Sequence, residues 1–238
     1  MTTIHHGVKW ARTNMVYSPT LFFFIVSGFL SAWLSFSIEY LMLKSWKMVR
    51  RDYLLGFPVG FGLLALAYVA LDISYVYPLT DAWNLGRLLL GSWGFAFLAM
   101  TYFLRYHPAK RDNTGATTLG LATLSLLTIF SFASVIALPF TLLPYFLTAE
   151  LGYRIVNLLL LGYVIYSLSK ALKTQTELSS VVLGFTFLAI EQCSLLLNTI
   201  NREFVWPVVF AELVRIVGLL ILAVFLVRGF QSGTRRAA

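Results

Sequence analysis

Apart from Glu39, which lies toward the inner side, seven charged side chains lie at or above the middle of stretches of the sequence that are otherwise apolar. They are Asp72, Arg87, Glu150, Arg154, Glu191, Glu212 and Arg215. A charge inside a lipid bilayer is costly, so in membrane proteins such residues mark ligand sites, ion paths or ion pairs. The chemistry open to this set is the binding of an ion, of a proton or of a ligand that itself carries charge.

Helical spacing groups four of these charges into two pairs. Glu150 and Arg154 are four residues apart, so both lie on one face of a helix, and Asn157 continues that face. Glu212 and Arg215 are three residues apart and form a second pair in the same way. Each pair is therefore expected to lie along one side of its helix.

Glu191 differs from the other acids because no Lys or Arg lies within a helical turn of it. It shares a stripe of its helix with Asn198, and we expect both side chains to join the same polar cluster as the two pairs. The candidate ligand- or ion-binding residues are therefore Asp72, Arg87, Glu150, Arg154, Asn157, Glu191, Asn198, Glu212 and Arg215.

Two interpretations of this cluster stay open at the level of sequence. The pairs can neutralise one another and fix the rotation of the helices. Alternatively, the four acids exceed the three arginines by one, which leaves Glu191 or Glu212 to titrate, to bind a cation or to hold the positive group of a ligand. We favour Glu191 for this role and expect its replacement by Gln to alter activity or pH response more than folding.

The amino-acid composition indicates the environment in which these residues lie. The chain of 238 residues is 59% hydrophobic and 12% charged, whereas about a quarter of the residues in a soluble domain are charged. Seven stretches reach the roughly 20 apolar residues that a helix needs to cross a bilayer. They are residues 21–43, 53–77, 83–106, 117–140, 145–172, 179–200 and 204–228. We expect an all-α, polytopic integral membrane protein with the lipid bilayer as its main partner.

The connections between these spans are short, so residues 1–238 are expected to form a single seven-helix transmembrane domain. Residues 1–20 are expected to be an interfacial segment, and residues 229–238 a short basic cytoplasmic tail. Alternating spans place twelve basic residues on one side and only three in loops on the other. Under the positive-inside rule the amino terminus is outside and the carboxyl terminus cytoplasmic. This bias accounts for most of the net charge of +8 without a nucleic-acid partner, and it favours the plasma membrane.

Small residues recur at the spacing that lets helix backbones approach one another. Ser27, Ser31 and Ser35 are four residues apart, and Gly56 and Gly60 form a GxxxG pattern. Gly91 and Gly94 lie on the following span. In lipid, helices associate through close packing and interhelical hydrogen bonds, so we interpret these faces as helix contacts.

Several kinds of chemistry lack the residues that they need. His5, His6 and His107 fall outside the spans, which excludes haem ligated by histidines within the bilayer. Every lysine is terminal or in a loop, so a retinal Schiff base in mid-membrane is not expected. We predict no metal site and no other cofactor, and the absence of catalytic motifs predicts that the chain is not an enzyme.

The resulting hypothesis is a sensory or receptor-like module. It would recognise a small ligand or ion through the polar cluster in its outer half and signal through a partner, since no output domain is evident. Two alternatives remain. The chain could be an accessory subunit of a larger membrane complex, or a channel or transporter for protons or cations.

Overall fold

The structure, a computed structural model, describes residues 19–49, 52–76, 81–106, 143–172, 178–201 and 205–237. These residues form six long α-helices and one short 3₁₀ helix, η1. The elements are α2 (Pro19–Val49), η1 (Asp52–Leu55), α3 (Gly56–Val76), α4 (Asp81–Tyr106), α6 (Leu143–Leu172), α7 (Ser179–Ile200) and α8 (Trp206–Ala237). The predicted all-α class is thus confirmed for the described residues.

Five of these helices, α2, α3, α6, α7 and α8, are long and apolar enough to cross a membrane. Large apolar side chains are exposed on their surfaces, which suits contact with hydrocarbon. Examples are Phe22, Phe29, Trp33, Leu159, Tyr166 and Leu197. The chain is therefore a multi-pass membrane protein. The predicted helix in α4 is also present, but Asn84, Arg87 and Ser92 interrupt its apolar sequence, and it is not among the five.

The predicted helix boundaries agree with the observed ones to within a few residues at most ends. The clearest differences are at α2 and α8, which continue past the apolar stretches to Val49 and Ala237. α8 thus extends through most of the segment predicted as a basic tail. The predicted span 117–140 and nearly all of the predicted interfacial segment 1–20 lie outside the described residues. Within the described residues there are six long helices rather than the seven expected.

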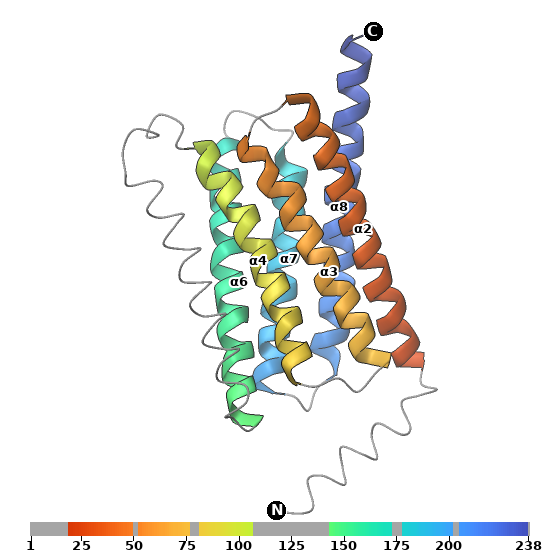
Figure 1. The fold of residues 1–238 in the computed structure, drawn as a ribbon, viewed down its shortest axis with the longest axis vertical. Coiled ribbons are helices and arrows are strands. Elements are labelled where there is room, and N and C mark those ends of the chain that lie inside the picture. Colours follow the sequence, from red (N-terminus) through yellow and green to blue (C-terminus); the bar gives the residue numbers. More distant parts are fainter. Residues whose placement is uncertain are drawn as a thin grey trace, which may run out of the picture.

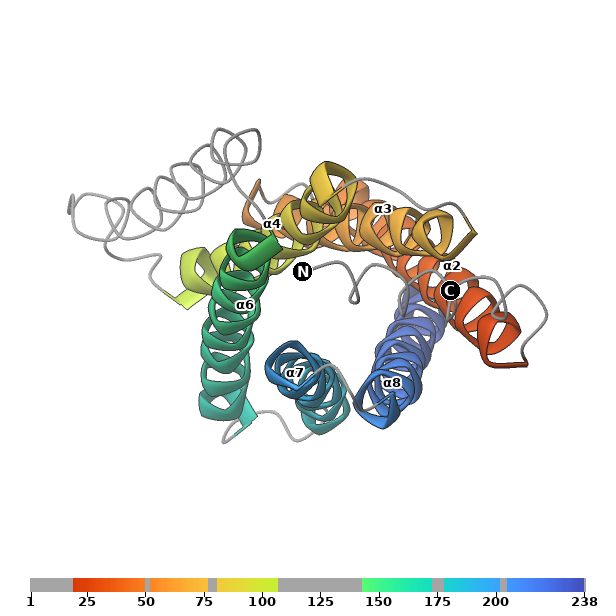
Figure 2. The ribbon, with the colours of Figure 1, turned by 90° about the horizontal axis from the view of Figure 1, so that it is seen from below.

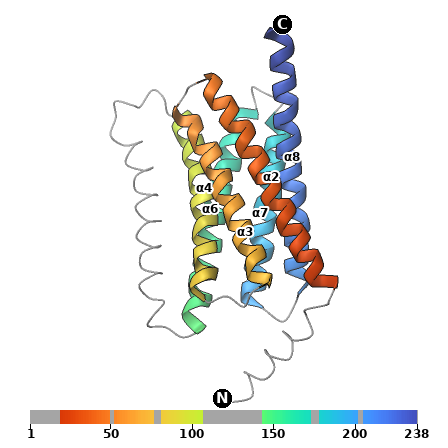
Figure 3. The same ribbon diagram turned by 45° about the vertical axis from the view of Figure 1, so that its right-hand side comes forward.

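The six helices form a closed ring. Going around it, the order is α2, α3, α4, α6, α7 and α8, and α8 packs against α2 again (Figure 2). The chain runs in one direction along α2, α4, α6 and α8 and in the opposite direction along α3 and α7 (Figures 1 and 3). The ring therefore has two ends, one where α2, α4, α6 and α8 begin and one where they finish.

Close glycine contacts hold two pairs of neighbouring helices together. A Cβ at Gly60 of α3 would lie 2.9 Å from the carbonyl oxygen of Gly94 of α4, and a Cβ at Gly94 would lie 2.9 Å from that of Gly60. Gly184 and Gly218 form a similar contact between α7 and α8. The expected packing role is confirmed for Gly60 and Gly94, whereas Gly91 makes only an ordinary contact, with its Cβ position 4.0 Å from Ala67 Cβ.

Apolar and aromatic side chains fill the half of the ring where α2, α4, α6 and α8 finish. The ring of Tyr102 meets that of Phe57 edge to face, with centroids 5.2 Å apart, and that of Phe185 in the same way at 6.0 Å. Ile38 and Leu168 are fully buried in the same cluster. The buried charged side chains Arg154, Glu191, Glu212 and Arg215 lie in the other half.

Candidate functional site

A cavity of about 1430 Å³ lies inside the ring, and all six helices contribute to its lining. It reaches the end of the ring where α2 and α8 begin, because Pro19, Val76 and Trp206 line it there. In the opposite direction it extends as far as Leu64 and Phe95. A pocket of this size exceeds the roughly 300 to 1,000 Å³ typical of small-molecule sites, so it could hold a ligand of substantial size.

Arg215 of α8 is the centre of the first polar cluster in this cavity. Its Nη2 donates to Glu212 of the same helix, and its Nη1 lies 3.5 Å from Glu191 Oε1 on α7. Its Nε donates to Ser31 Oγ on α2 at 2.9 Å. The guanidinium carbon also lies 4.5 Å from the ring centroid of Tyr68, a cation–π contact. One side chain thereby joins four helices.

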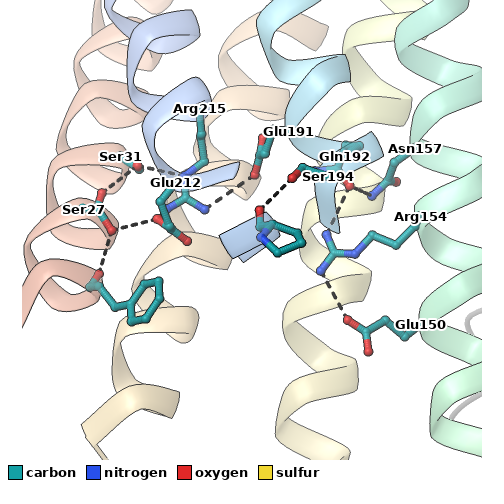
Figure 4. A network of polar contacts seen from close by, with 12 residues as sticks. Ser27, Ser31, Glu150, Arg154, Asn157, Glu191, Gln192, Ser194, Glu212 and Arg215 are labelled. Atoms are coloured by element: carbon teal, nitrogen blue, oxygen red, sulfur yellow. Dashed lines mark hydrogen bonds and ion pairs between the residues drawn. The ribbon is translucent and has the colours of Figure 1, made fainter. Parts of the chain in front are cut away.

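Ser27 connects the same cluster to α2 a second time. Its Oγ donates to Glu212 Oε2 at 2.8 Å, while Ser31 Oγ donates to the carbonyl oxygen of Ser27 at 2.7 Å. Figure 4 shows both serines facing Glu212 and Arg215 across the gap between α2 and α8 (Figure 4). The serine stripe therefore contributes specific hydrogen bonds as well as the predicted close packing.

Gln192 of α7 is the centre of the second polar cluster. Its Oε1 accepts hydrogen bonds from Arg154 Nη1 and from Asn157 Nδ2 on α6, each at 3.2 Å. Arg154 Nη2 lies 3.5 Å from Glu150 Oε1 one turn away on α6. The predicted pairing of Glu150 with Arg154 is thus observed, and Gln192 ties that pair to the next helix.

Replacing Gln192 by Leu is expected to lower the free energy of unfolding by about 1 to 2 kcal/mol, because two buried donors on α6 would lose their acceptor. Thermal unfolding in detergent micelles measures the change. Thr186→Ala on the same helix is the matched control, since Thr186 Oγ1 bonds only to the carbonyl of Val182 one turn away. If both variants unfold alike, Gln192 does not link α6 to α7 as described.

Several buried polar atoms of residues that line the cavity have no hydrogen-bond partner among the described residues. They are Tyr68 Oη, Arg87 Nε, Arg154 Nε, Asn157 Oδ1 and Glu191 Oε2. Glu191 is 1% exposed, Asn157 2% and Arg154 6%. A buried polar atom without a partner costs about 1 to 3 kcal/mol. Such atoms around a cavity are the groups that a bound molecule would satisfy.

Eight of the nine predicted site residues line the cavity, and Asp72 does not. Asp72 faces Gly28 of α2, where a Cβ would collide with its carboxylate. It was expected among the binding residues, but its side chain points from α3 toward α2, while its neighbours Leu71 and Tyr75 line the cavity. Whether the eight bind a ligand stays a prediction.

The displacement of Asp72 changes the charge balance that the sequence indicated. Among the described residues, the charged side chains that line the cavity are three arginines and three glutamates. The expected surplus of one acid therefore does not hold within the cavity itself. Arg215 contacts two of the glutamates and Arg154 the third.

Sequence reasoning missed Gln192, Tyr68 and the polar role of Ser27 and Ser31. An amide in the middle of an apolar span, directly after Glu191, was an available signal for Gln192. Ser27 and Ser31 carried a signal too, but four-residue spacing of serines equally indicates packing. Nothing in the sequence distinguishes Tyr68 from an ordinary aromatic residue.

Within the described part of the chain, no group of three or more His, Cys, Asp or Glu side chains is placed to hold a metal ion. No protein-family model, no curated protein and no solved structure is significantly similar to this chain. The chemistry of the cavity is therefore the basis for a functional proposal.

Proposed function

We propose that this protein is a non-enzymatic, receptor-like membrane protein that recognises a small ligand or ion in the cavity and signals through a partner. The observation that carries this proposal is a set of buried polar atoms, on residues that line a cavity of about 1430 Å³, that have no partner within the part of the chain that the structure describes. Charges that served only to fix the helices would be expected to satisfy one another fully. Here one carboxylate oxygen of Glu191 lies near Arg215, and the other has no hydrogen-bond partner among the residues that the structure describes.

The same proposal includes seven spans, with the amino terminus outside and the carboxyl terminus cytoplasmic, in the plasma membrane. α4 and α6 run in the same direction, which agrees with the predicted span 117–140 between them. Lys44, Lys47 and Lys170 are near the finishing ends of α2 and α6, and Arg228 is at the end of the apolar part of α8. Positive-inside orientation makes that end cytoplasmic and turns the cavity outward.

The apolar half of the ring favours recognition over conduction. Any path for protons or cations through the ring would have to pass the packed side chains of Phe57, Tyr102 and Phe185. The other alternative is an accessory subunit, because the contacts of Arg215 with four helices would stabilise the bundle even if no ligand were bound. Stable co-purification with other membrane subunits and an empty cavity would favour that role.

Glu191→Gln is expected to remove most ligand binding while leaving folding nearly unchanged. Gln has almost the same shape, and Arg215 keeps Glu212 as its charged partner. Native mass spectrometry of the protein released from nanodiscs would detect bound small molecules, and thermal unfolding would report stability. We expect small-molecule adducts on the wild type and their loss in the variant.

Glu39→Gln is the matched control, since Glu39 faces Gly62 of α3 and does not line the cavity. It should keep the adducts. Loss of stability in Glu191→Gln with unchanged adducts would contradict the proposal and make Glu191 a structural residue. Ion flux in liposomes that depends on Glu191 would favour transport instead.

A further inference from the structure

Each of the two walls of the cavity carries three of its six charged groups, but the walls differ in their ratio of acids to bases. On the wall formed by α7 and α8, Glu191 and Glu212 face Arg215, which leaves one acid in excess. The wall formed by α4 and α6 carries Arg87, Arg154 and Glu150, of which Arg154 lies 3.5 Å from Glu150, so this wall has one base in excess. Figure 4 shows Glu191, Glu212 and Arg215 grouped together, with Arg154 and Glu150 apart from them. Counted over the described residues, the cavity lining has no net formal charge but has an acidic side and a basic side.

Among the described residues, the unpartnered atoms of the charged side chains that line the cavity follow the same division, whereas Asn157 Oδ1 on α6 is an unpartnered acceptor. Glu191 Oε2 on the acidic wall is a hydrogen-bond acceptor, and Nε of Arg87 and Nε of Arg154 on the basic side are donors. Glu191 and Arg154 are both more than nine-tenths buried. A cation alone would satisfy only the first wall, and an anion alone only the second. A ligand that carries both charges satisfies both.

We infer that the ligand is an organic zwitterion, with its ammonium group held by Glu191 and its anionic group by Arg87 and Arg154. This assignment rests on the proposed ligand-binding function and adds the chemical class of the ligand. An ammonium group supplies N–H donors for Glu191 Oε2, and a carboxylate or phosphate accepts from guanidinium groups in the geometry that arginine favours.

The remainder of the lining gives the ligand an apolar portion. The cavity is much larger than two charged groups require, and apolar side chains such as Phe24, Leu71, Leu88 and Phe95 line it. An amino acid with an apolar side chain has this chemistry, and so does the headgroup of phosphatidylethanolamine, which joins an ammonium and a phosphate to acyl chains. The shared chemistry is the pair of opposite charges next to an apolar body.

The test uses the full-length protein in nanodiscs of phosphatidylglycerol, which has no amine. Isothermal titration with each of the standard amino acids identifies the tightest binder. That amino acid is then compared with the amine that lacks its carboxylate and with the acid that lacks its amine. We expect the amino acid to bind at least about tenfold more tightly than either analogue, because each analogue lacks one of the two hydrogen bonds to a charged group.

In a second arm of the experiment, phosphatidylethanolamine is added to the nanodiscs, and native mass spectrometry reports whether the protein retains it in preference to phosphatidylglycerol.

Two variants test which wall binds which charge. In Glu191→Gln, the affinity for the zwitterion should fall about tenfold or more while that for the acid analogue is unchanged. In Arg87→Gln, the zwitterion should lose affinity by a similar factor while the amine analogue is unaffected. Glu39→Gln should alter neither, and retention of phosphatidylethanolamine should follow the same pattern. We mutate Arg87 and not Arg154 because Arg154 also donates a hydrogen bond to Gln192 of α7, so its loss could affect stability as well as binding.

Each outcome bears on the zwitterion assignment. Preference for the amino acid supports a free ligand, and selective retention of phosphatidylethanolamine supports a lipid headgroup. An amine or acid analogue that binds as tightly as its parent overturns the assignment but leaves the proposed function standing. Failure of every amino acid and of phosphatidylethanolamine to bind also overturns it. In that event, native mass spectra that show a different bound small molecule would still support the proposed ligand-binding function. Native mass spectra without any bound molecule would contradict both the zwitterion assignment and the proposed function.

Discussion

Replacement of Arg215 by Met is expected to lower the free energy of unfolding by about 3 to 5 kcal/mol, because it leaves buried carboxylates without their counter-charge. Arg215, Glu191 and Glu212 each have side chains that are 2% exposed. Arg215 also donates to Ser31 and packs on Tyr68, so the variant loses contacts to α2 and α3 as well. Equilibrium unfolding in mixed detergent micelles measures the change.

Two further variants separate the loss of charge pairing from the loss of a long side chain. Arg228→Met removes an exposed arginine from the same helix and should change the free energy of unfolding by no more than about 0.5 kcal/mol. Combining Arg215→Met with Glu191→Gln and Glu212→Gln should restore much of the stability, because no buried carboxylate is then left unpaired. Equal stability of Arg215→Met and Arg228→Met would show that the cluster does not support the fold.

Replacement of Gly94 by Leu is expected to destabilise the protein by about 3 kcal/mol, because the α3–α4 contact has no room for a side chain. A Cβ there would lie 2.9 Å from the carbonyl oxygen of Gly60 and 2.8 Å from Leu64 Cγ. The carbonyl belongs to the helix backbone, so the helices themselves must separate. Because α4 also carries Arg87, ligand binding should weaken together with stability.

Gly86→Leu on the same helix is the matched control, since nothing lies within 4 Å of its Cβ position. It should unfold like the wild type or slightly later, because Leu favours the helix over Gly. Unfolding curves of the two variants, recorded in the same micelles, give the comparison. Similar destabilisation by both would mean that helix α4 does not depend on its contact with Gly60.

Sequence reasoning predicted the helices and the local charge pairs well, because both depend on residues that are close along the chain. A bilayer-spanning helix requires an uninterrupted apolar stretch, which can be read directly from the residues. The pairs Glu150 with Arg154 and Glu212 with Arg215 follow from helical periodicity. The observed contacts agree with both.

The contacts of Glu191 and Ser27 with other helices, and the direction of the Asp72 side chain, could not be predicted in this way. Glu191 meets Arg215 from another helix, and Ser27 meets a residue 185 positions away. In a soluble bundle an apolar stripe reveals which face of a helix is buried. Here α2, α3 and α6 are apolar almost all around, because one face meets hydrocarbon and the other meets neighbouring helices.

The sequence by itself therefore determined that the chain is an apolar membrane protein of several helices, and it determined the position of each charged residue along its helix. Only the tertiary structure decided how each helix is rotated within the ring. That rotation directs Asp72 toward Gly28, brings Glu191 to Arg215 and divides the cavity into an acidic and a basic wall. The physical reason is that rotation depends on close packing and interhelical hydrogen bonds among all six helices, which no single segment encodes.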